Sequence, residues 1–421
     1  MAKLQSHKCW DKRLRNRRGT AAAALLVAGV TLSGCASSPG SSPSSDSTPL
    51  KIGISLSLTG DFADPGKAAQ RGYDLWATEV NKRGGVLGRQ VELKIVDDTS
   101  SPDQVVTNYQ NLITGDKVDL VFGPFSSLLT IPASRVAKRY GYAFIEPAGG
   151  GPKVFDQHLD NIFFVQPAPV VKGGDVFADY ILSLPADQRP KTAAYPKLDD
   201  PFAAPIADNV KQRFEAAGIR TVYDETYAAE TADMGPIVTK VAAAKPDVVV
   251  AGTQIEDSYA EVKAMIQQKF NPKWLFMSNG ASSPADFPDK VGYANTAGIF
   301  SSGDWYPDSP IAGTKEFIAA YAAKYGGNGN AIDNTSAEAF ASGTLVELVA
   351  AKTGKADNAT IIQTLHSGTW PTLVGNLSWN ADGAPNGSYL LVQWIDGRLR
   401  TVYPPDTAQH PPLTPKPQWA G

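Results

Sequence analysis

From residue 51 onward, short apolar runs alternate with longer amphipathic segments. The run KIGISLSL predicts a buried strand, and the segment AAQRGYDLWATEVNKRGG after it places Leu75, Trp76 and Val80 on one face at helical spacing. The same unit recurs in VELKIVDD and SPDQVVTNYQNLITG, then in VDLVFGP, a helix near 130–139 and YAFIEPA. Strands that alternate with helices in this way predict a parallel, doubly wound sheet.

A second series of the same kind begins near Lys191. KTAAY, IRTVYDE, DVVVAG and KWLFMS predict strands, and the segments between them predict helices near 202–217, 236–244 and 256–268. The later chain is less regular, with three helical runs between residues 313 and 366 and a hairpin in YLLVQWIDGRLRTVYP. The pattern therefore predicts an α/β protein with two doubly wound lobes in succession.

The first 34 residues differ from the rest of the chain. Seven basic residues precede AAAALLVAGVTL, an apolar run too short to span a bilayer core of roughly 30 Å. This order predicts a cleaved export signal, and the general route is favoured over twin-arginine export because NRRGTAAAA lacks apolar residues after the arginine pair. The run ends in LSGC, which resembles the bacterial lipoprotein box and implies that Cys35 is lipidated. A chance buried cysteine is the weaker alternative.

The composition predicts a flexible tether after the leader and an acidic net charge for the chain that remains once the leader is removed. Residues 36–49, ASSPGSSPSSDSTP, are too poor in apolar side chains to fold, so the folded part should start near Leu50. Cys9 and Cys35 are the two cysteines, so a cleaved chain has no pair for a disulfide. The leader carries seven basic residues and one acidic residue, and its removal changes the net charge from −3 to −9. That charge argues against nucleic acid or anionic lipid as a partner.

Catalytic and metal-binding motifs are not found. GDFADPGKA, residues 60–68, has five residues between its glycines where a P-loop needs four, and Ala68 follows Lys67 where a P-loop needs a hydroxyl. The segment is more typical of a loop at the carboxyl end of a strand, where open sheets bind ligands, and we expect Phe62 to face one. The four histidines are scattered and no nucleophile elbow occurs, so we expect no catalytic residue, metal or cofactor.

Two adjacent acidic pairs follow strands, Asp97–Asp98 and Asp199–Asp200. A general acid and base can occupy such positions. Because Asx side chains commonly cap helices and make turns, the structural interpretation is favoured over a catalytic one.

Several segments taken together resemble a known family. In order along the chain they are KIGISLSLTG, NKRGGVLGRQVELKIVDD, VFGPFSSLLTIPAS, YAFIEPAGG, VVVAG, GNLSWNADG and LLVQW. They are similar to the type I periplasmic solute-binding proteins of ABC importers, leucine/isoleucine/valine-binding group, over residues 51–403. The resemblance implies two lobes that close like a hinge on a ligand, joined by three crossovers near 166–172, 297–303 and 375–386.

The resemblance and the composition together imply domain boundaries. We expect the signal peptide at 1–34, the lipidated cysteine and tether at 35–49, the N-terminal lobe at 50–168 plus 300–378, the C-terminal lobe at 169–299 plus 379–405, and a Pro-rich tail at 406–421. The tail is expected to lie extended because of its prolines.

The resemblance also implies where a ligand carboxylate binds. In EPAGGGP, three glycines follow a strand, and their exposed N–H groups can bind an anion. By similarity to amino-acid binders of the family, Ser127 with its neighbour Ser126 should grip the carboxylate together with Ala148, Gly149 and Gly150. A threonine hydroxyl usual in the family falls on Gly150, and this departure weakens the amino-acid interpretation.

Other positions of the family's pocket are only partly retained. By this resemblance, one usual aromatic residue falls on Pro201 or, with a shift of one residue, on Phe202, and another falls on Gln254. The acid that binds the ligand ammonium should lie in FMSNGA, where Asn279 and Gly280 are both neutral. Loss of that acid removes a charge-assisted bond of about 1.5–3 kcal/mol.

Three further residues remain open at this point. Glu146 or Asp304 is a candidate to replace the missing acid, although a surface or hinge position is the favoured interpretation of each. Trp305 is a candidate to cover a flat apolar ligand, with core packing as the equal alternative.

These inferences predict a monomeric lipoprotein at the outer face of the cytoplasmic membrane. We expect it to carry a small carboxylate-bearing molecule, an amino acid or a derivative, to the permease and ATPase subunits of an ABC importer, without enzyme activity. The alternatives are an aromatic or short acyl acid or amide as the ligand, or a ligand sensor of the same fold.

Overall fold

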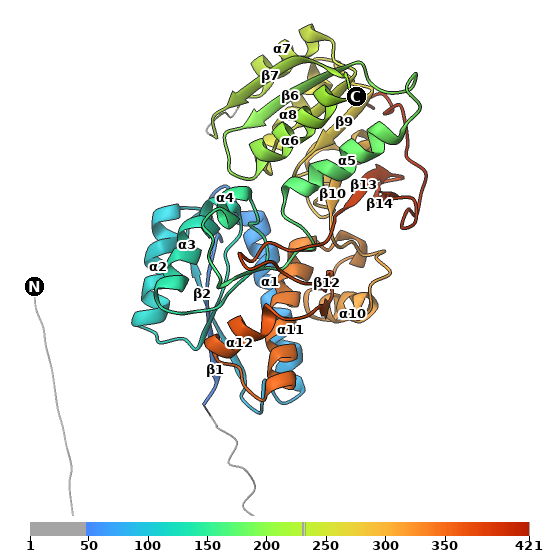
Figure 1. Cartoon of the computed structure of the whole chain (residues 1–421). Helices are drawn as coiled ribbons and strands as arrows, with labels where there is room; N and C mark the ends of the chain where they lie inside the picture. Colours follow the sequence, from blue (N-terminus) through green and yellow to red (C-terminus); the bar gives the residue numbers. More distant parts are fainter. Residues whose placement is uncertain (1–47, 230, 232, 421) are drawn as a thin grey trace, which may run out of the picture. The chain divides into compact units, whose positions relative to one another are not determined.

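The computed structural model describes residues 48–229, 231 and 233–420. The predicted leader, Cys35 and nearly all of the predicted tether lie outside the described residues. Two sheets organise the described chain, and each has its own helices (Figure 1).

The first sheet is parallel throughout and has the strand order β2-β1-β3-β4-β5. Its strands are β1 (Leu50–Leu56), β2 (Val91–Asp97), β3 (Leu120–Phe122), β4 (Phe144–Glu146) and β5 (Ile162–Phe164). The helices of this lobe that lie between the strands are α1 (Ala63–Lys82), α2 (Pro102–Thr114), α3 (Ser127–Arg139) and α4 (Pro152–Phe155). The order reverses beside β1, as in a doubly wound sheet, so the predicted first series is confirmed.

Later segments return to the first lobe. They are α10 (Thr314–Tyr325), the 3₁₀ turn η2 (Gly329–Ala331), α11 (Asn334–Thr353), α12 (Asn358–Leu365) and the small ladder of β11 (Trp370–Thr372) and β12 (Gly375–Leu377). α11 lies against α1, where Gly72 and Gly343 permit close approach. A Cβ at Gly343 would come within 1.9 Å of the Trp76 ring. This packing brings residues near 335 next to the first sheet.

The second sheet is mixed and has the strand order β14-β13-β10-β9-β8-β6-β7. Its strands are β6 (Thr192–Leu198), β7 (Arg220–Tyr227), β8 (Val248–Ala251), β9 (Trp274–Met277), β10 (Ile299–Gly303), β13 (Leu390–Ile395) and β14 (Arg398–Tyr403). The run from β10 to β7 is parallel, whereas the predicted hairpin forms β13 and β14 and pairs antiparallel with β10. The predicted two-lobed α/β class is confirmed, with this antiparallel edge as an addition.

The helices of the second lobe are α5 (Val171–Ser183), α6 (Ala203–Ala216), α7 (Gly235–Ala244), α8 (Glu256–Gln267), α9 (Phe287–Val291) and the 3₁₀ turn η1 (Tyr293–Asn295). The chain passes from the first sheet to the second after β5, returns after β10 and crosses again between β12 and β13. Because β10 is a strand of the second sheet, the chain rejoins the first lobe after Gly303, and the segment 297–303 is not itself a free connection.

The C-terminal segment is held against the second lobe along its length. The main-chain N–H of Lys416 donates to the Lys273 carbonyl at 3.0 Å, and Trp419 Nε1 donates to the Phe270 carbonyl at 2.7 Å. The proline pattern predicts an extended segment but not these contacts, because the partners lie more than a hundred residues away.

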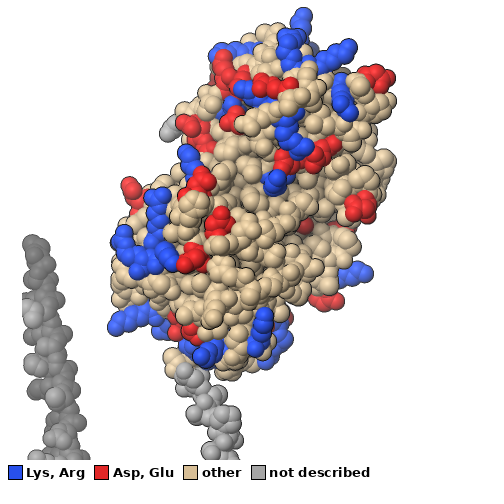
Figure 2. Space-filling model, viewed as in Figure 1, with Lys and Arg blue, Asp and Glu red and all other residues tan. Residues whose placement is uncertain are grey.

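Among the described residues, no helix combines the length and the apolarity needed to cross a membrane. On the face drawn in Figure 2, acidic and basic side chains are interspersed without a large field of one sign. This face therefore does not present the basic stripe that a nucleic acid backbone requires.

Candidate ligand-binding site

A cleft lined by both lobes lies at the carboxyl ends of the strands. It holds about 620 Å³ of space not filled by protein atoms, including its opening. The first lobe contributes residues that follow β3 and β4, and the second lobe contributes residues that follow β6, β8, β9 and β10. Open α/β sheets bind ligands at this end of their strands.

Seven of the ten predicted ligand-binding residues line this one cleft. They are Ser126, Ser127, Ala148, Gly149, Phe202, Gln254 and Asn279. They come from five different loops and helix starts, so the fold brings together positions spread over more than 150 residues of sequence. Their role in binding stays a prediction.

Phe62 and Trp305 do not line the cleft. Phe62 is buried against Phe125, with the ring centroids 5.8 Å apart, so Phe125 is the aromatic side chain that faces the cleft. Trp305 is fully buried in the first lobe, where its Nε1 donates to Thr314 Oγ1 at 3.1 Å and its ring meets Phe317 edge-on. For Trp305 the structure therefore favours core packing, the alternative left open by the sequence, and the expectation that Phe62 faces the ligand is corrected because its ring is buried against Phe125.

Each of the three glycines of EPAGGGP packs so closely against neighbouring protein atoms that a side chain would not fit. A Cβ at Gly149 would lie 2.5 Å from Thr130 Oγ1, and one at Gly150 would lie 2.3 Å from the Phe164 ring. One at Gly151 would lie 2.5 Å from the Pro201 carbonyl oxygen. Gly150 therefore faces the core and does not line the cleft, so a hydroxyl at that position is excluded by Phe164. Its absence carries no information about the ligand.

One end of the cleft is formed by the start of α3. The Ser126 hydroxyl caps this helix by accepting from the Leu129 N–H, and the Ser126 N–H donates to the Ala148 carbonyl at 2.6 Å. Ser127 is fully buried, and its Oγ accepts a hydrogen bond from the Gly151 N–H at 2.9 Å. A hydroxyl that accepts in this way still has its own proton to donate. The helix N-terminus adds a partial positive charge, so this end suits an anion.

Glu146 lies beneath the same end without lining the cleft. Its side chain is fully buried, and Oε1 accepts from the Ala148 N–H at 2.8 Å. Burial raises the pKa of Glu146 to about 8, so the group is largely neutral at pH 7. It positions the loop that carries Ala148 and is not placed to contact a ligand.

The second-lobe wall is an oriented chain of amides. Gln254 Nε2 donates to Asp200 Oδ1 at 3.1 Å, and Asn279 Nδ2 donates to Gln254 Oε1 at 3.0 Å. Asp200 Oδ1 also accepts from the N–H groups of Phe202 and Ala203, so it binds free N–H groups at the start of α6. The structural interpretation of the pair Asp199–Asp200 therefore holds for Asp200, which acts as a cap and as a support for Gln254.

The pair Asp97–Asp98 is likewise structural. Asp97 Oδ1 accepts from the Leu58 N–H at 2.9 Å, and Asp98 Oδ1 accepts from Ser57 Oγ at 2.6 Å. Both carboxylates thus fasten the loop after β1 to the loop after β2, and neither lines the cleft. In the described ranges, no group of three or more His, Cys, Asp or Glu side chains is arranged to hold a metal ion.

Glu338 on α11 is an acidic lining residue that the sequence did not indicate. It is 1% exposed, and its Oε1 accepts from Asn334 Nδ2 at 2.8 Å. Asp304 lies behind it, 4% exposed, and accepts from the same nitrogen at 3.2 Å. The one available signal was a glutamate in an otherwise small and apolar helical stretch, TSAEAFASG. None of the described residues that line the cleft is Lys, Arg or His.

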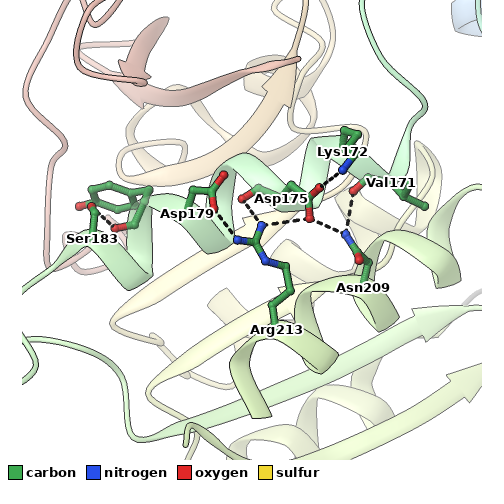
Figure 3. Close-up of polar contacts among 8 residues, drawn as sticks. Val171, Lys172, Asp175, Asp179, Ser183, Asn209 and Arg213 are labelled. Carbon is green, nitrogen blue, oxygen red and sulfur yellow. Dashed lines mark hydrogen bonds and ion pairs between the residues drawn. The ribbon is translucent and has the colours of Figure 1, made fainter. Parts of the chain in front are cut away.

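The two second-lobe helices that border the cleft are clamped together (Figure 3). Arg213 on α6 donates through Nη1 to Asp175 Oδ1 on α5 at 3.0 Å and pairs through Nη2 with Asp179. Asn209 Nδ2 donates to Asp175 Oδ1 at 2.7 Å and to the Val171 carbonyl at 3.2 Å. Partial burial acts to raise the pKa of the Asp175 carboxyl, but Lys172 and Asn209, with a smaller contribution from Arg213, lower it below its ordinary value. The clamp fixes the helices whose first turns line the cleft.

Comparisons with known proteins agree with this architecture. A Leu/Ile/Val-binding protein homologue of Brucella melitensis is 27% identical over 361 residues, which cover 83% of this chain and 92% of the relative. A Streptococcus pneumoniae branched-chain amino acid transporter substrate binding protein, solved with isoleucine, superposes with a TM-score of 0.73 at 22% identity, covering 84% of this chain and 98% of that one.

A second solved structure broadens the range of ligands seen on this fold. A Rhodopseudomonas palustris ABC transporter solute binding protein, solved with 3,4-dihydroxybenzoic acid, superposes with a TM-score of 0.71 at 21% identity, covering 83% of this chain and 95% of that one. The profile of the family described as periplasmic binding protein matches residues 49–398. The chain therefore belongs to the periplasmic binding protein family, whose members bind solutes and do not transform them.

Proposed function

We propose that this protein captures a small carboxylate-bearing solute in the cleft between its lobes and delivers it to an ABC importer. The observation that carries the proposal is the anion-binding end of the cleft. There the Ser127 hydroxyl and the start of α3 meet the loop of Ala148 and Gly149 inside a buried, water-restricted space. The absence of basic side chains from the described lining makes these neutral donors the recognition elements for an anion.

The solute is proposed to be an amino acid or a close derivative. Phe125 and Phe202 provide apolar surface for a side chain, and Gln254 and Asn279 provide oriented amide groups. The isoleucine complex of the Streptococcus pneumoniae protein supports a ligand of this size on the same fold.

An aromatic carboxylic acid is the second candidate. Two features favour it: the neutral Asn279 at the position of the expected ammonium-binding acid, and the pairing of Phe125 with Phe202 in the lining. The 3,4-dihydroxybenzoic acid complex of the Rhodopseudomonas palustris protein supports this alternative by similarity.

Hinge closure and the lipid anchor complete the proposal. The three passages between the sheets allow the lobes to rotate about the connecting segments, so a ligand that contacts both walls would favour the closed arrangement. We propose that Cys35, by resemblance to the lipoprotein box, holds the protein at the outer face of the cytoplasmic membrane.

A thermal-shift panel of amino acids, aromatic acids, short acyl acids, amides and uncharged sugars tests the solute class. Protein lacking the predicted leader and Cys35 should melt at a higher temperature with one or more carboxylates, because a ligand that binds the folded state stabilises it. Stabilisation by sugars alone, or by metal ions alone, would contradict the carboxylate proposal.

A further inference from the structure

Two buried carboxyl groups meet at the cleft and share one amide. Asn334 Nδ2 donates to Asp304 Oδ1 at 3.2 Å and to Glu338 Oε1 at 2.8 Å. The Trp305 N–H gives Asp304 Oδ1 a second bond, at 2.8 Å. The remaining oxygen of each carboxyl, Asp304 Oδ2 and Glu338 Oε2, has no hydrogen-bond partner among the described residues. Each side chain is more than nine-tenths buried, so solvent does not replace the missing partner.

None of the charged groups that the described part of the chain places nearest to this pair is positive. The titratable groups that face it are two further acids and three tyrosines: Asp333, Glu146, Tyr73, Tyr306 and Tyr389. Tyr389 and Tyr306 approach from the second lobe and from the loop after β10, and Gln166 approaches from the first crossover. Every charge that these groups can carry is negative, and a buried unpaired carboxylate is strongly disfavoured.

The pair therefore retains a proton when the cleft is empty. Burial raises the pKa of Asp304 to about 7, and burial together with the nearby Asp304 charge raises the pKa of Glu338 well above its usual range. Two carboxyl groups that share a site cannot both ionise easily, because each charge opposes the other. At neutral pH at least one of the two is protonated.

A purely structural role explains only half of this arrangement. The bridging amide of Asn334 accounts for one oxygen of each carboxyl and leaves the other oxygen of each unsatisfied. Glu338, Asn334 and Gly303 line the cleft, so a molecule in the cleft can reach this group. A buried polar atom without a partner is destabilising, and a ligand that supplies the partner recovers that free energy.

We propose that Glu338, backed by Asp304, receives the cationic amine of the solute and that the pair releases a proton to solvent when the amine binds. The inference rests on the proposed solute-binding function and names the class of solute, a zwitterion with both a carboxylate and an amine. The carboxylate would bind at Ser127 and the amine at Glu338, and both residues line the same cleft from the first lobe. This assigns the acid to α11, away from Asn279 in the second lobe.

When both carboxyls of the empty pair are protonated, the solute's ammonium pairs with one of them as a carboxylate, the proton of that carboxyl passes to the buffer, and the second carboxyl keeps its proton. A pair that is already singly ionised binds the ammonium without releasing a proton, so at most one proton is released per molecule bound. Because the bound form needs one ionised carboxyl, affinity for an amine-bearing solute rises with pH by up to about tenfold per unit while both carboxyls are protonated in the empty protein. The affinity for a solute without the amine should not rise with pH in this way.

Calorimetry with matched probes tests the inference. The common L-amino acids are screened beside analogues that lack the amine, such as L-leucine with 4-methylpentanoate and L-phenylalanine with 3-phenylpropanoate, together with benzoate. Binders are titrated at pH 7 in phosphate and in Tris, whose different ionisation enthalpies reveal proton release. We expect an amine-bearing probe to release a measurable fraction of a proton, up to one, per molecule bound, with a larger fraction at lower pH, and its amine-free analogue to release none.

Two variants test whether Glu338 and Asp304 are the source of the released proton. Glu338→Gln should lower the affinity for the amine-bearing probe at least tenfold and abolish proton release. The affinity for an amine-free acid bound at Ser127 should not change. Asp304→Asn should reduce proton release while leaving the Glu338 oxygens in place. Glu261→Gln is the matched control, because Glu261 is also fully buried with both oxygens unpartnered but lies away from the cleft. It should change neither affinity nor proton release.

The outcomes separate the two proposals. Amine binding without proton release, or release that persists in Glu338→Gln, overturns this inference. Binding of amine-free acids alone overturns it too, but leaves the proposed capture of a carboxylate intact. If no probe with a carboxylate binds, the proposed function fails and the inference fails with it. Proton release measured with the wild-type protein tests the inference even if a variant does not fold.

Discussion

The hydroxyl of Ser127 accepts a hydrogen bond from the Gly151 N–H at 2.9 Å, although one residue follows β3 and the other follows β4. This bond joins the two loops that form the anion-binding end of the cleft. It also fixes the rotation of the Ser127 side chain, so that its remaining proton can point away from Gly151 toward the cleft.

Replacement of Ser127 by alanine should weaken carboxylate binding by tenfold or more. The variant loses one hydrogen bond to a charged group, which contributes about 1.5–3 kcal/mol, and it also leaves the Gly151 N–H without its partner. Calorimetric titration of a bound carboxylate gives the affinity. Ser134→Ala on the same helix is the control, because Ser134 is also fully buried but does not line the cleft. Equal affinities in Ser127→Ala and wild type would remove Ser127 from the site.

Replacement of Gly72 by alanine should destabilise the first lobe. A Cβ at this position would come within 2.1 Å of the Ser336 carbonyl oxygen, so α1 and α11 would have to separate. Overpacking of this kind typically costs about 1–3 kcal/mol, although alanine is the better helix former. Urea denaturation measures the loss of unfolding free energy, and a stability equal to or above wild type would contradict the close packing.

The same helix contact predicts an effect on binding. α11 carries Asn334, Thr335 and Glu338 to the cleft, so a shift of α11 in Gly72→Ala should also weaken ligand binding. Gly115→Ala is the matched control, since Gly115 ends α2 away from the cleft and its Cβ would meet only the Asn111 carbonyl at 3.0 Å. It should leave affinity unchanged.

Buried acids predict that the empty protein loses stability as pH rises from 5 to 7. The folded-state pKa values of Glu146 and Glu261 are raised by burial to about 8, and that of Asp304 to about 7. A raised pKa contributes stability that is fully present below the unfolded value and is lost as pH rises through the folded value. Lys416, whose pKa is lowered by burial to about 7, acts in the opposite sense only above that range.

Urea denaturation of wild type and Glu261→Gln at pH 5, 6 and 7 measures this effect. The wild-type unfolding free energy should fall with pH, and the variant should show a shallower fall because one of the raised acids is gone. Parallel pH profiles for the two proteins would show that Glu261 is not protonated in the folded state.

Replacement of Cys35 by alanine should release the protein from the membrane fraction without a change in ligand affinity. The cysteine lies outside the described residues, and a flexible tether is predicted between it and the fold, which begins at Leu50. Fractionation of cells that express each form measures the distribution. Retention of the variant in membranes would contradict a lipid anchor at this residue.

Sequence patterns predicted the architecture and most of the cleft lining because both depend on local signals. Buried parallel strands are nearly continuous apolar runs, as in VVVA of β8, and the loops at their carboxyl ends must meet at one edge. Ser127, Ala148, Phe202 and Asn279 each follow such a run closely, so the topology alone places them together.

Side-chain direction could not be predicted in the same way. Gly150 and Trp305 lie within two residues of cleft residues, yet both point into the core because Phe164 and Phe317 pack against them. Glu338 was missed because its place depends on α11 packing on α1, a contact between segments more than 260 residues apart. The small and apolar neighbours of Glu338 in TSAEAFASG indicate burial, but they do not indicate that the buried acid reaches a cleft.

A crystal structure with the most stabilising carboxylate from the thermal-shift panel shows whether the solute is held by its carboxylate between the lobes. We expect one ligand in the cleft, with its carboxylate within hydrogen-bond distance of Ser127 Oγ and of the first N–H groups of α3, and contacts to both lobes. A ligand bound outside the cleft, or one whose carboxylate points away from Ser127, would contradict this expectation.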